Sequence, residues 1–571
     1  MCRTPLPTAV CVSLLLTLAM YLVNCGGSPS SDQSGNGGGT TVSGVSMWKG
    51  DPSEKGLYPN ETTLTPGNVN VTQFGRLGSF QADGLLVAQP LYLPSLDMGQ
   101  AGMHNVIILA SEHDSIFAID ADNPGAGPLW QRSYLDPPNG VTTLPDNFGG
   151  RSTFDGEVGI TGTPFIDSTT GTVYFVTVLA RNGVAEQWLR AVDVRTGDDY
   201  GAGSMKIQAS VPGDGKGNVN GQIPFDPSIQ NQRAGLTKVA GSILVAWGSF
   251  SDVGVYHGWL MAFDPKSLAL RAVFNPTTQS QTVDPAGGPS DHGGGGSFWQ
   301  GGAPPAVDPA GNIYIASADG SFNADQGGNN YGDTVLKLSL SNGKFQIVDW
   351  FTPFNQACID TADLEVGSGG VTLLPTDFTG GANRAVVLDK EGRLFLLNTD
   401  NLGKFNASGD TQIPQEFMVG AKMCVDGMGS SEAEGSDWNR LYGNVSYWNG
   451  NLYAAASNTT LKQYQFNNGL LNPTPVAVSP TAYGVRGGNS VVSANGNQNG
   501  IVWVNEKAAV TSQGILHAYD ATSVSHELWN SNMNGERDAL GEGVGFGAPV
   551  VLNGRVIVTY DFRVGIYGLL P

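Results

Sequence analysis

The 571-residue sequence predicts an all-β protein, an eight-bladed β-propeller built from four-stranded antiparallel blades. Three observations lead to this prediction. A unit of four short apolar strands joined by tight turns recurs along the chain. Glycine accounts for 80 residues and charged residues for only 14%, which is typical of many short strands between turns. The last copy of the unit lacks one strand, and a suitable strand stands near the N-terminus.

Seven copies of the unit are complete, and each is expected to form one blade. A copy starts with a Gly-, Pro- or Ala-rich strand, continues through two apolar strands, and ends with a strand that often carries Trp. The copies occupy, in order, residues 88–135, 162–211, 234–268, 302–351, 369–401, 443–469 and 490–531. Because one such sheet cannot bury both of its faces alone, the copies are expected to stack radially.

The eighth copy, residues 547–570, provides only three strands. The missing strand is assigned to residues 74–80, FGRLGSF, which precede the first copy. Pairing of these two segments would complete the last blade, close the ring and remove an exposed sheet edge. Seven blades is the alternative count.

The N-terminus has the features of a targeting segment. Arg3 precedes an apolar stretch, residues 6–23, that is short for a membrane span but suited to a signal-peptide core. The stretch ends in Leu-Val-Asn-Cys, which resembles a bacterial lipoprotein signal with Cys25 as the lipidated residue, although Asn24 departs from the usual small residue. Cleavage elsewhere or an uncleaved anchor are the alternatives. The expected organisation is a signal peptide (1–24), a Gly/Ser-rich disordered tether (25–46) and a propeller (47–571), outside the cytoplasm and lipid-anchored to a bacterial membrane.

The net charge of −21 limits the partners. Nucleic acid needs Lys and Arg to neutralise its phosphates, so it is excluded as a partner. An anionic membrane surface is disfavoured for the same reason, which leaves the N-terminal lipid as the only membrane contact. Two cysteines of the mature chain, Cys358 and Cys424, are expected in neighbouring loops and could form a disulfide in a compartment that permits one.

The repeats resemble a known family. The phrases SIFAIDADN…PLW, WLRAVDVRTG and GILHAYDATS…ELW are similar to the pyrroloquinoline quinone (PQQ) repeat, over residues 70–571. The resemblance implies that an Asp and a Trp of the repeat tie neighbouring blades together; the matching residues here are Asp120, Asp193, Asp264, Asp520, Trp130 and Trp529. The family contains PQQ- and Ca²⁺-dependent dehydrogenases as well as a cofactor-free lipoprotein of the outer-membrane β-barrel assembly machine.

The unusual residues are expected to share one face of the propeller. Turns between the first and second strands of a blade, such as DPAGN and WNGN, have plain turn chemistry. Turns between the second and third strands, and the links between blades, emerge on the opposite face and carry the acidic, His and Cys residues. This face is therefore the expected ligand-binding mouth.

Eight residues are candidates for lining that mouth: Glu112, His113, Asp114, Glu157, Arg233, His257, His292 and Trp299. For His113 the alternative role is hydrogen bonding between blades. For Glu157 and Arg233 it is an ion pair across the channel, and for the Trp it is core packing. Asn329, Asp333 and Asp363 are candidate Ca²⁺ ligands because they lie in loops rich in oxygen donors, although the D-x-D-x-D-G spacing is absent.

Two functions remain open. The first is a binding or scaffold propeller that holds a glycan, peptide or protein at its polar mouth. The second is a quinoprotein dehydrogenase that oxidises alcohols or sugars, with PQQ and Ca²⁺ as cofactors and with Glu157 or Asp363 accepting the substrate proton. The chain has no adjacent pair of cysteines of the kind that many PQQ dehydrogenases place against the quinone, which makes PQQ binding doubtful and favours the first function.

Overall fold

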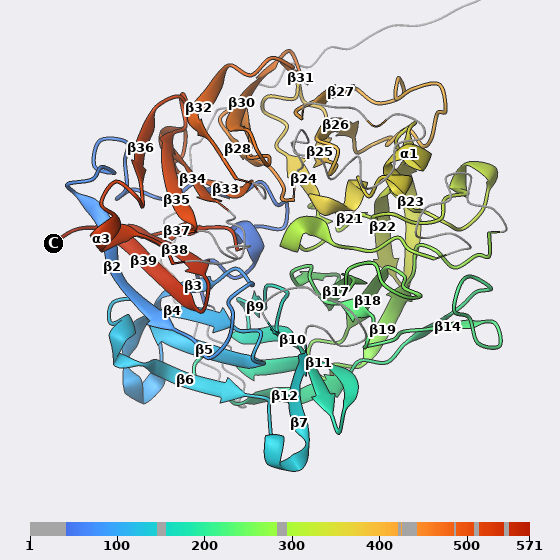
Figure 1. Cartoon of the computed structure of the whole chain (residues 1–571), viewed down its shortest axis with the longest axis horizontal. Helices are drawn as coiled ribbons and strands as arrows, with labels where there is room; N and C mark the ends of the chain where they lie inside the picture. The colour runs from blue at the N-terminus through green and yellow to red at the C-terminus, as the bar shows by residue number, and fades with distance from the viewer. Residues whose placement is uncertain are drawn as a thin grey trace, which may run out of the picture. The chain divides into compact units, whose positions relative to one another are not determined.

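A computed structural model of the chain describes residues 42–145, 156–281, 294–420, 424, 442–484, 487–506, 513–541 and 547–571. The chain divides into two compact units, and the larger, Thr40–Pro571, contains every described residue. Its main sheets form eight blades around a central axis (Figure 1). The predicted eight-bladed propeller is thus confirmed, and the alternative of seven blades is not favoured.

In each of blades 1 to 4, successive strands pair antiparallel from the axis outward. The strands of these four blades are, in order, β3 (Leu91–Asp97), β4 (Met103–Ala110), β5 (Ser115–Asp120) and β6 (Pro128–Ser133); β9 (Phe165–Asp167), β10 (Thr172–Arg181), β11 (Val184–Asp193) and β12 (Asp199–Lys206); β16 (Thr237–Val239), β17 (Ser242–Ser249), β18 (Trp259–Phe263) and β19 (Leu270–Phe274); and β20 (Ala306–Val307), β21 (Ile313–Ala316), β22 (Val335–Ser341) and β23 (Lys344–Phe351).

Blades 5 to 8 repeat this order, and the outermost strand of blade 8 comes from the N-terminal part of the chain. Their strands are β24 (Val371–Leu374), β25 (Arg384–Leu388), β26 (Arg393–Asn398) and β27 (Gln415–Met418); β28 (Ser446–Trp448), β29 (Asn451–Ala454), β30 (Thr460–Asn467) and β32 (Ala477–Ala482); β33 (Gly488–Asn495), β34 (Gln498–Glu506), β35 (Ile515–Asp520) and β36 (Glu527–Asn530); and β37 (Val550–Leu552), β38 (Arg555–Tyr560), β39 (Arg563–Leu569) and β2 (Phe74–Gln81).

The remaining elements decorate the blades. The additional strands are β1 (Leu57–Tyr58), β7 (Val141–Pro145), β8 (Glu157–Val158), β13 (Ser210–Pro212), β14 (Gln222–Pro224), β15 (Gln230–Asn231) and β31 (Leu470–Leu471). The helices are short: η1 (Trp48–Gly50), η2 (Gly99–Ala101), η3 (Pro124–Ala126), η4 (Pro137–Asn139), η5 (Gln300–Gly302), η6 (Ala324–Gln326), α1 (Gln356–Thr361), η7 (Val366–Ser368) and α3 (Gly535–Asp538). Among the described residues, none of the helices has the length and apolar character needed to span a membrane.

Strand β2 closes the ring as the sequence predicts. It pairs antiparallel with β39, with Phe74 opposite Leu569 and Phe80 opposite Val564. The Phe74 ring packs against Trp503 and Trp529, with centroid distances of 5.4 and 5.0 Å. A strand from near one end of the chain is therefore held in the last blade by both the backbone ladder and an aromatic cluster.

Apolar side chains fill the space between neighbouring blades. One buried cluster contains Tyr174 and Val176 of β10 together with Val245 and Trp247 of β17. Every residue of β17 is buried, because the two faces of a blade are covered by the blades on either side rather than by solvent. This explains why the strands read as continuous apolar runs instead of alternating ones.

The segment before β1 packs along the inner strands of the blades. The carbonyl oxygens of Ser46, Pro52, Ser53 and Lys55 accept main-chain N–H groups of, respectively, Ile166, Val307, Leu373 and Tyr447 in blades 2, 4, 5 and 6. β1 then pairs parallel with β33 of blade 7. Packing already begins at Val42, whose side chain is buried, and residues 25–41 of the expected tether lie outside the described residues.

Candidate functional site

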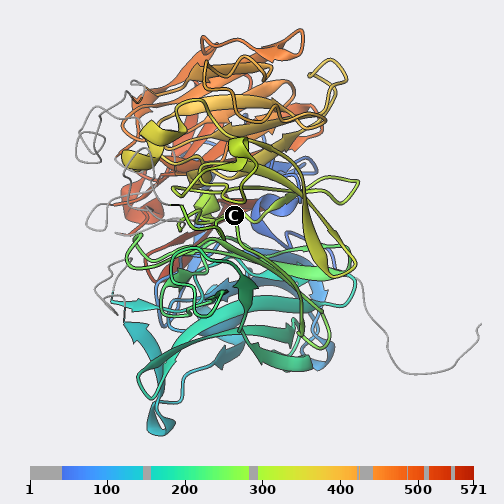
Figure 2. The same ribbon diagram turned by 90° about the vertical axis from the view of Figure 1, so that its right-hand side faces the viewer.

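Acidic side chains from neighbouring blades meet on the loop side of blades 4 and 5. Asp319 follows β21, and Asp333 directly precedes β22 in the same blade. Asp360 lies on α1, and Asp363 and Glu365 follow α1 in the link to blade 5. We refer to these five residues as the acidic cluster. In the side view, α1 (yellow) lies toward one face of the propeller and the N-terminal segment (dark blue) toward the other (Figure 2).

Close approach of the main chain brings these loops together. The Gly320 N–H donates to Asp360 Oδ1 at 2.8 Å, which joins the blade 4 loop to α1. A Cβ atom at Gly320 would lie only 2.4 Å from the main-chain nitrogen of Gly296. Any side chain at this position would therefore push the loop that carries Asp319 away from its neighbour.

The acidic cluster contains two overlapping sets of carboxylates with metal-ligand spacing. In the first set, single oxygen atoms of Asp319, Asp363 and Glu365 all lie within 4.8 Å of one another. In the second, the same holds for Asp319, Asp333 and Asp360. Asp319 belongs to both sets, so it is the common point of the acidic cluster.

Asp319 is also a member of the acidic cluster with an incompletely hydrogen-bonded carboxylate. Its side chain is only 3% exposed, and its Oδ1 atom has no hydrogen-bond partner among the described residues. Its neighbour Asp333, by contrast, accepts hydrogen bonds from Val366 N–H and Gln356 Nε2 at 3.3 and 3.2 Å. A buried carboxylate oxygen without a donor is unfavourable unless a cation or a proton satisfies it.

Burial and mutual repulsion change the acidity of the acidic cluster. Desolvation, reinforced by the neighbouring carboxylates, raises the pKa of Asp319 and of Asp333 well above the usual range. Burial likewise raises the pKa of Glu365 to about 8, although Lys390 opposes the shift. Without a cation, part of the acidic cluster is therefore protonated near neutral pH.

Lys390 borders the acidic cluster from the turn between β25 and β26. Its Nζ forms an ion pair with Asp363 and a second one with Glu365 Oε2 at 3.1 Å. Burial alone would lower the pKa of Lys390, but Glu365 and Asp363 outweigh burial and raise it. The lysine consequently stays charged and balances one of the five carboxylates.

This donor set suits a hard divalent cation. All the ligand atoms offered are carboxylate oxygens, which Ca²⁺ prefers, whereas softer metals favour nitrogen or sulfur. A divalent ion would satisfy Asp319 Oδ1 and relieve the repulsion between the carboxylates. Either set of three carboxylates, Asp319 with Asp363 and Glu365 or Asp319 with Asp333 and Asp360, fits such an ion and would hold it through ionised ligands.

The turn between β4 and β5 of blade 1, which carries Glu112 and Asp114, joins blade 1 to its neighbour. Glu112 Oε2 accepts hydrogen bonds from Gly159 N–H and Thr161 Oγ1 at 2.8 and 2.9 Å, and burial raises the pKa of Glu112 to about 7. Asp114 Oδ1 accepts the Val178 N–H of β10 at 3.1 Å. Both carboxylates therefore bond to blade 2 or to the link that leads into it, and neither belongs to the acidic cluster.

The other charged candidates of the mouth pair locally. His113 Nδ1 lies 3.0 Å from Glu157 Oε2, so this histidine also links blade 1 to the segment before blade 2. Arg233 is buried, and desolvation lowers its pKa to about 10 against the opposing charge of Glu112. The alternative role of Arg233 is an ion pair with Glu157, and the charge that opposes the lowering of its pKa is that of Glu112.

The remaining mouth candidates have different roles. His257 is buried, with Nδ1 2.9 Å from Thr277 Oγ1 and Nε2 2.8 Å from the Lys216 carbonyl, so both ring nitrogens are engaged in holding loops together. Trp299 is partly exposed and packs against Gly248. His292 lies outside the described residues.

Two of the expected metal ligands are brought together. Asp333 and Asp363 belong to the acidic cluster, one in each carboxylate set. Asn329 is exposed, and its main-chain N–H donates to Gln279 Oε1 at 3.1 Å. A disulfide joins Cys358 on α1 to Cys424, with a Cα–Cα distance of 6.0 Å. Cys25, the expected lipidation site, lies outside the described residues.

Two members of the site were not singled out from the sequence. Asp319 lies in the turn after the second strand of blade 4, and Lys390 occupies the corresponding turn of blade 5. A polar residue at the same turn position in consecutive repeats is the signal that could have identified both. Their proximity to the link residues Asp363 and Glu365 depends on how blades 4 and 5 pack.

No family model and no curated protein matches this sequence. Several solved structures share its fold. The quinohemoprotein alcohol dehydrogenase ADHIIG from Pseudomonas putida HK5 is 15% identical, with a TM-score of 0.56, covering 92% of this chain and 80% of that one. The quinohemoprotein alcohol dehydrogenase from Comamonas testosteroni has the same identity and coverages and a TM-score of 0.55. A europium-containing methanol dehydrogenase is 14% identical, with a TM-score of 0.56, covering 92% of this chain and 98% of that one. The chain thus has a PQQ-like propeller fold, and at such identities the likeness shows the fold alone.

Proposed function

We propose that the acidic cluster binds a divalent cation of the calcium class, and that the propeller uses this ion to hold a polar ligand at its loop-side mouth. The observation that supports this proposal is that Asp319 belongs to two sets of three carboxylates with metal-ligand spacing, while its buried Oδ1 has no hydrogen-bond partner among the described residues. Such a site is costly to maintain without a cation, because like charges are held together away from water.

The ligand of this site is proposed to be rich in oxygen. Hydroxyl, carbonyl or carboxylate oxygens of a glycan, peptide or protein can complete the coordination of Ca²⁺, which takes six to eight oxygen ligands. Lys390 stands beside the ion site and can donate a hydrogen bond to the same ligand. The partly exposed indole of Trp299 offers an apolar surface for stacking.

Calcium titration by isothermal calorimetry tests the cation proposal. Asp319→Asn should weaken Ca²⁺ binding by at least about tenfold, because it removes a charge shared by both ligand sets. Asp325→Asn is the matched control, since Asp325 is exposed in the same loop. Lys390→Gln should instead strengthen binding, because it removes a positive charge beside the ion. Equal affinities in wild type and in Asp319→Asn would exclude the site.

A quinoprotein dehydrogenase is the second candidate, and the raised pKa of Glu365 favours it. A carboxylate of raised pKa, such as Glu365 when it is ionised and not bound to the cation, can accept the proton of an alcohol or sugar hydroxyl. Lys390 keeps Glu365 and Asp363 oriented through its two ion pairs. Bound PQQ would supply a two-electron acceptor. Glu157 is not part of this arrangement, because it contacts His113.

Reconstitution separates the two candidates. Purified protein is supplied with Ca²⁺ and PQQ, its absorbance is recorded, and dye reduction is measured with alcohols and sugars. A quinone spectrum and dye reduction that is lost in Glu365→Gln would support the dehydrogenase. Calcium binding without either signal would support the binding protein.

Anchoring by a lipid on Cys25 is proposed from the sequence alone. In cell fractionation, the wild-type protein should partition with membranes, and Cys25→Ser should release it into the soluble fraction. Mass spectrometry of the mature N-terminus checks whether the chain is processed before Cys25. A soluble wild-type protein would contradict the anchor.

A further inference from the structure

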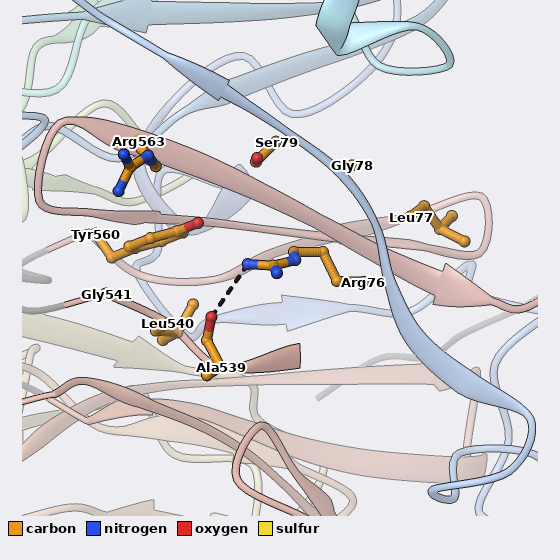
Figure 3. A pocket seen from close by; sticks show the side chains of 9 residues that line it. All are labelled: Arg76, Leu77, Gly78, Ser79, Ala539, Leu540, Gly541, Tyr560 and Arg563. Carbon is orange, nitrogen blue, oxygen red and sulfur yellow. Dashed lines mark hydrogen bonds between the residues drawn. The ribbon is translucent and has the colours of Figure 1, made fainter. Parts of the chain in front are cut away.

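A cavity of about 420 Å³ lies at the seam where the ring closes (Figure 3). One wall is the stretch of β2 from Arg76 to Ser79, and another is the segment 539–541 that follows α3. Tyr560 at the end of β38 and Arg563 at the start of β39 complete the lining. The volume is in the range of sites that hold small molecules.

The charge of this seam cavity is unusual for the protein. Among the described residues, the only charged side chains that line the cavity are Arg76 and Arg563. The sequence as a whole has a net charge of −21. Figure 3 shows the Arg76 guanidinium beside Ala539 and Tyr560, with Arg563 on the other side of Tyr560, and both arginines line the cavity. Acidic residues are therefore absent from the described lining of a site in a strongly acidic protein.

Neither guanidinium has its charge neutralised by a described carboxylate. Arg76 Nη1 donates to the Ala539 carbonyl at 3.1 Å, and Arg563 Nη2 donates to Gln81 Oε1 at 3.2 Å. Both acceptors are neutral. Several other arginines form ion pairs within 4 Å, such as Arg132 with Asp199 and Arg555 with Asp122. Each seam arginine therefore keeps N–H donors for a further acceptor.

We propose that the seam cavity binds a small anion, a carboxylate or a phosphate group, between Arg76 and Arg563. Guanidinium groups donate two parallel hydrogen bonds to either kind of anion. The side chain of Tyr560, which is 3% exposed, forms part of the same lining. Because Arg76 comes from β2 and Arg563 from β39, the anion would bridge the N-terminal and C-terminal strands of the closing blade.

This placement gives the anion a consequence for stability. Arg76 and Arg563 belong to one site only when β2 is paired with β39, so an anion that needs both binds the closed ring and not the unfolded chain. Its binding should then raise the unfolding temperature, by an amount that grows with the logarithm of the ratio of anion concentration to Kd. The effect is independent of the acidic cluster and of any cation held there.

The experiment measures binding of inorganic phosphate and of succinate to the whole protein, by calorimetry and by thermal unfolding. At least one anion should bind and raise the unfolding temperature, and the tighter of the two identifies the chemistry. Arg76→Gln and Arg563→Gln should each weaken binding by about tenfold or more. Circular dichroism shows whether each variant is folded. If Arg76→Gln does not fold, the affinity of Arg563→Gln alone decides the test.

Arg555→Gln is the matched control, because Arg555 belongs to the same blade but pairs with Asp122 outside the cavity. It should bind the anion as the wild type does. The proposal is overturned if the wild type binds neither anion, or if Arg563→Gln binds as tightly as the wild type. An equal loss of affinity in Arg555→Gln would show a general charge effect and would also overturn it.

Discussion

Lys49 reaches the main chain of Val445, with its Nζ donating a hydrogen bond to the carbonyl oxygen at 3.0 Å, although the two residues are 396 positions apart. A second hydrogen bond, of 3.1 Å, joins the same ammonium to the Asn444 carbonyl. Lys49 is fully buried, and its own N–H donates to Gln89 Oε1 of the segment before blade 1. One residue of the N-terminal segment thus connects blade 6 to blade 1.

Lys49→Met should change how stability depends on alkaline pH. Desolvation lowers the pKa of Lys49 in the folded protein to about 7, against 10.5 for an ordinary lysine. Between these values the unfolded chain binds more protons, so stability of the wild type should rise with pH by up to about 1.4 kcal/mol per unit. Denaturant unfolding from pH 7 to pH 10 checks this, and a rise of the same size in Lys49→Met would contradict it.

Glu365 should have the opposite effect at lower pH. Its pKa is raised from 4.5 to about 8 in the folded protein, so the folded state binds more protons in that window. In calcium-free buffer, stability should therefore fall as pH rises from about 5 to 8. The fall should be smaller in Glu365→Gln and smaller in wild type with excess Ca²⁺. The measurement is denaturant unfolding with and without a chelator, and an unchanged slope in Glu365→Gln would refute the assignment.

Loss of the disulfide should destabilise blade 5 and the site next to it. Cys358 and Cys424 are 66 residues apart, and a cross-link closing such a loop contributes about 4 kcal/mol in the chain-entropy model. The double variant Cys358→Ala, Cys424→Ala should lose stability of this order and bind Ca²⁺ more weakly, because Cys358 shares α1 with Asp360. Wild type treated with a reductant is the control and should behave like the double variant.

Phe74→Ala should weaken closure of the ring. The Phe74 ring is fully buried against Trp503, Trp529 and Tyr567, and truncation of such a side chain costs about 3–5 kcal/mol. Val71→Ala is the matched control, since Val71 is 37% exposed and should change stability by less than about 0.5 kcal/mol. Comparable losses in both variants would show that the pairing of β2 with β39 is not what holds the blade.

The repeating pattern in the sequence was sufficient for the blades. Each copy carries its own apolar strands and turn residues, which are local signals, and the register of β2 against β39 agrees with the predicted closing strand. The expected concentration of polar residues in particular turns also led to Asp333 and Asp363. The third expected ligand, Asn329, is exposed in the same loop as Asp333 and stays a prediction.

By itself, the sequence determined the number of blades, the closing strand and the loops that carry the acidic residues, because short-range patterns specify strands and turns. Only the tertiary structure decided that Asp319 and Lys390 meet Asp363 and Glu365, that Lys49 bonds to Val445, and that Arg76 shares a cavity with Arg563. These contacts join residues from different blades or from distant parts of the chain. They exist only after the blades pack into a closed ring, so no local pattern of residues can encode them.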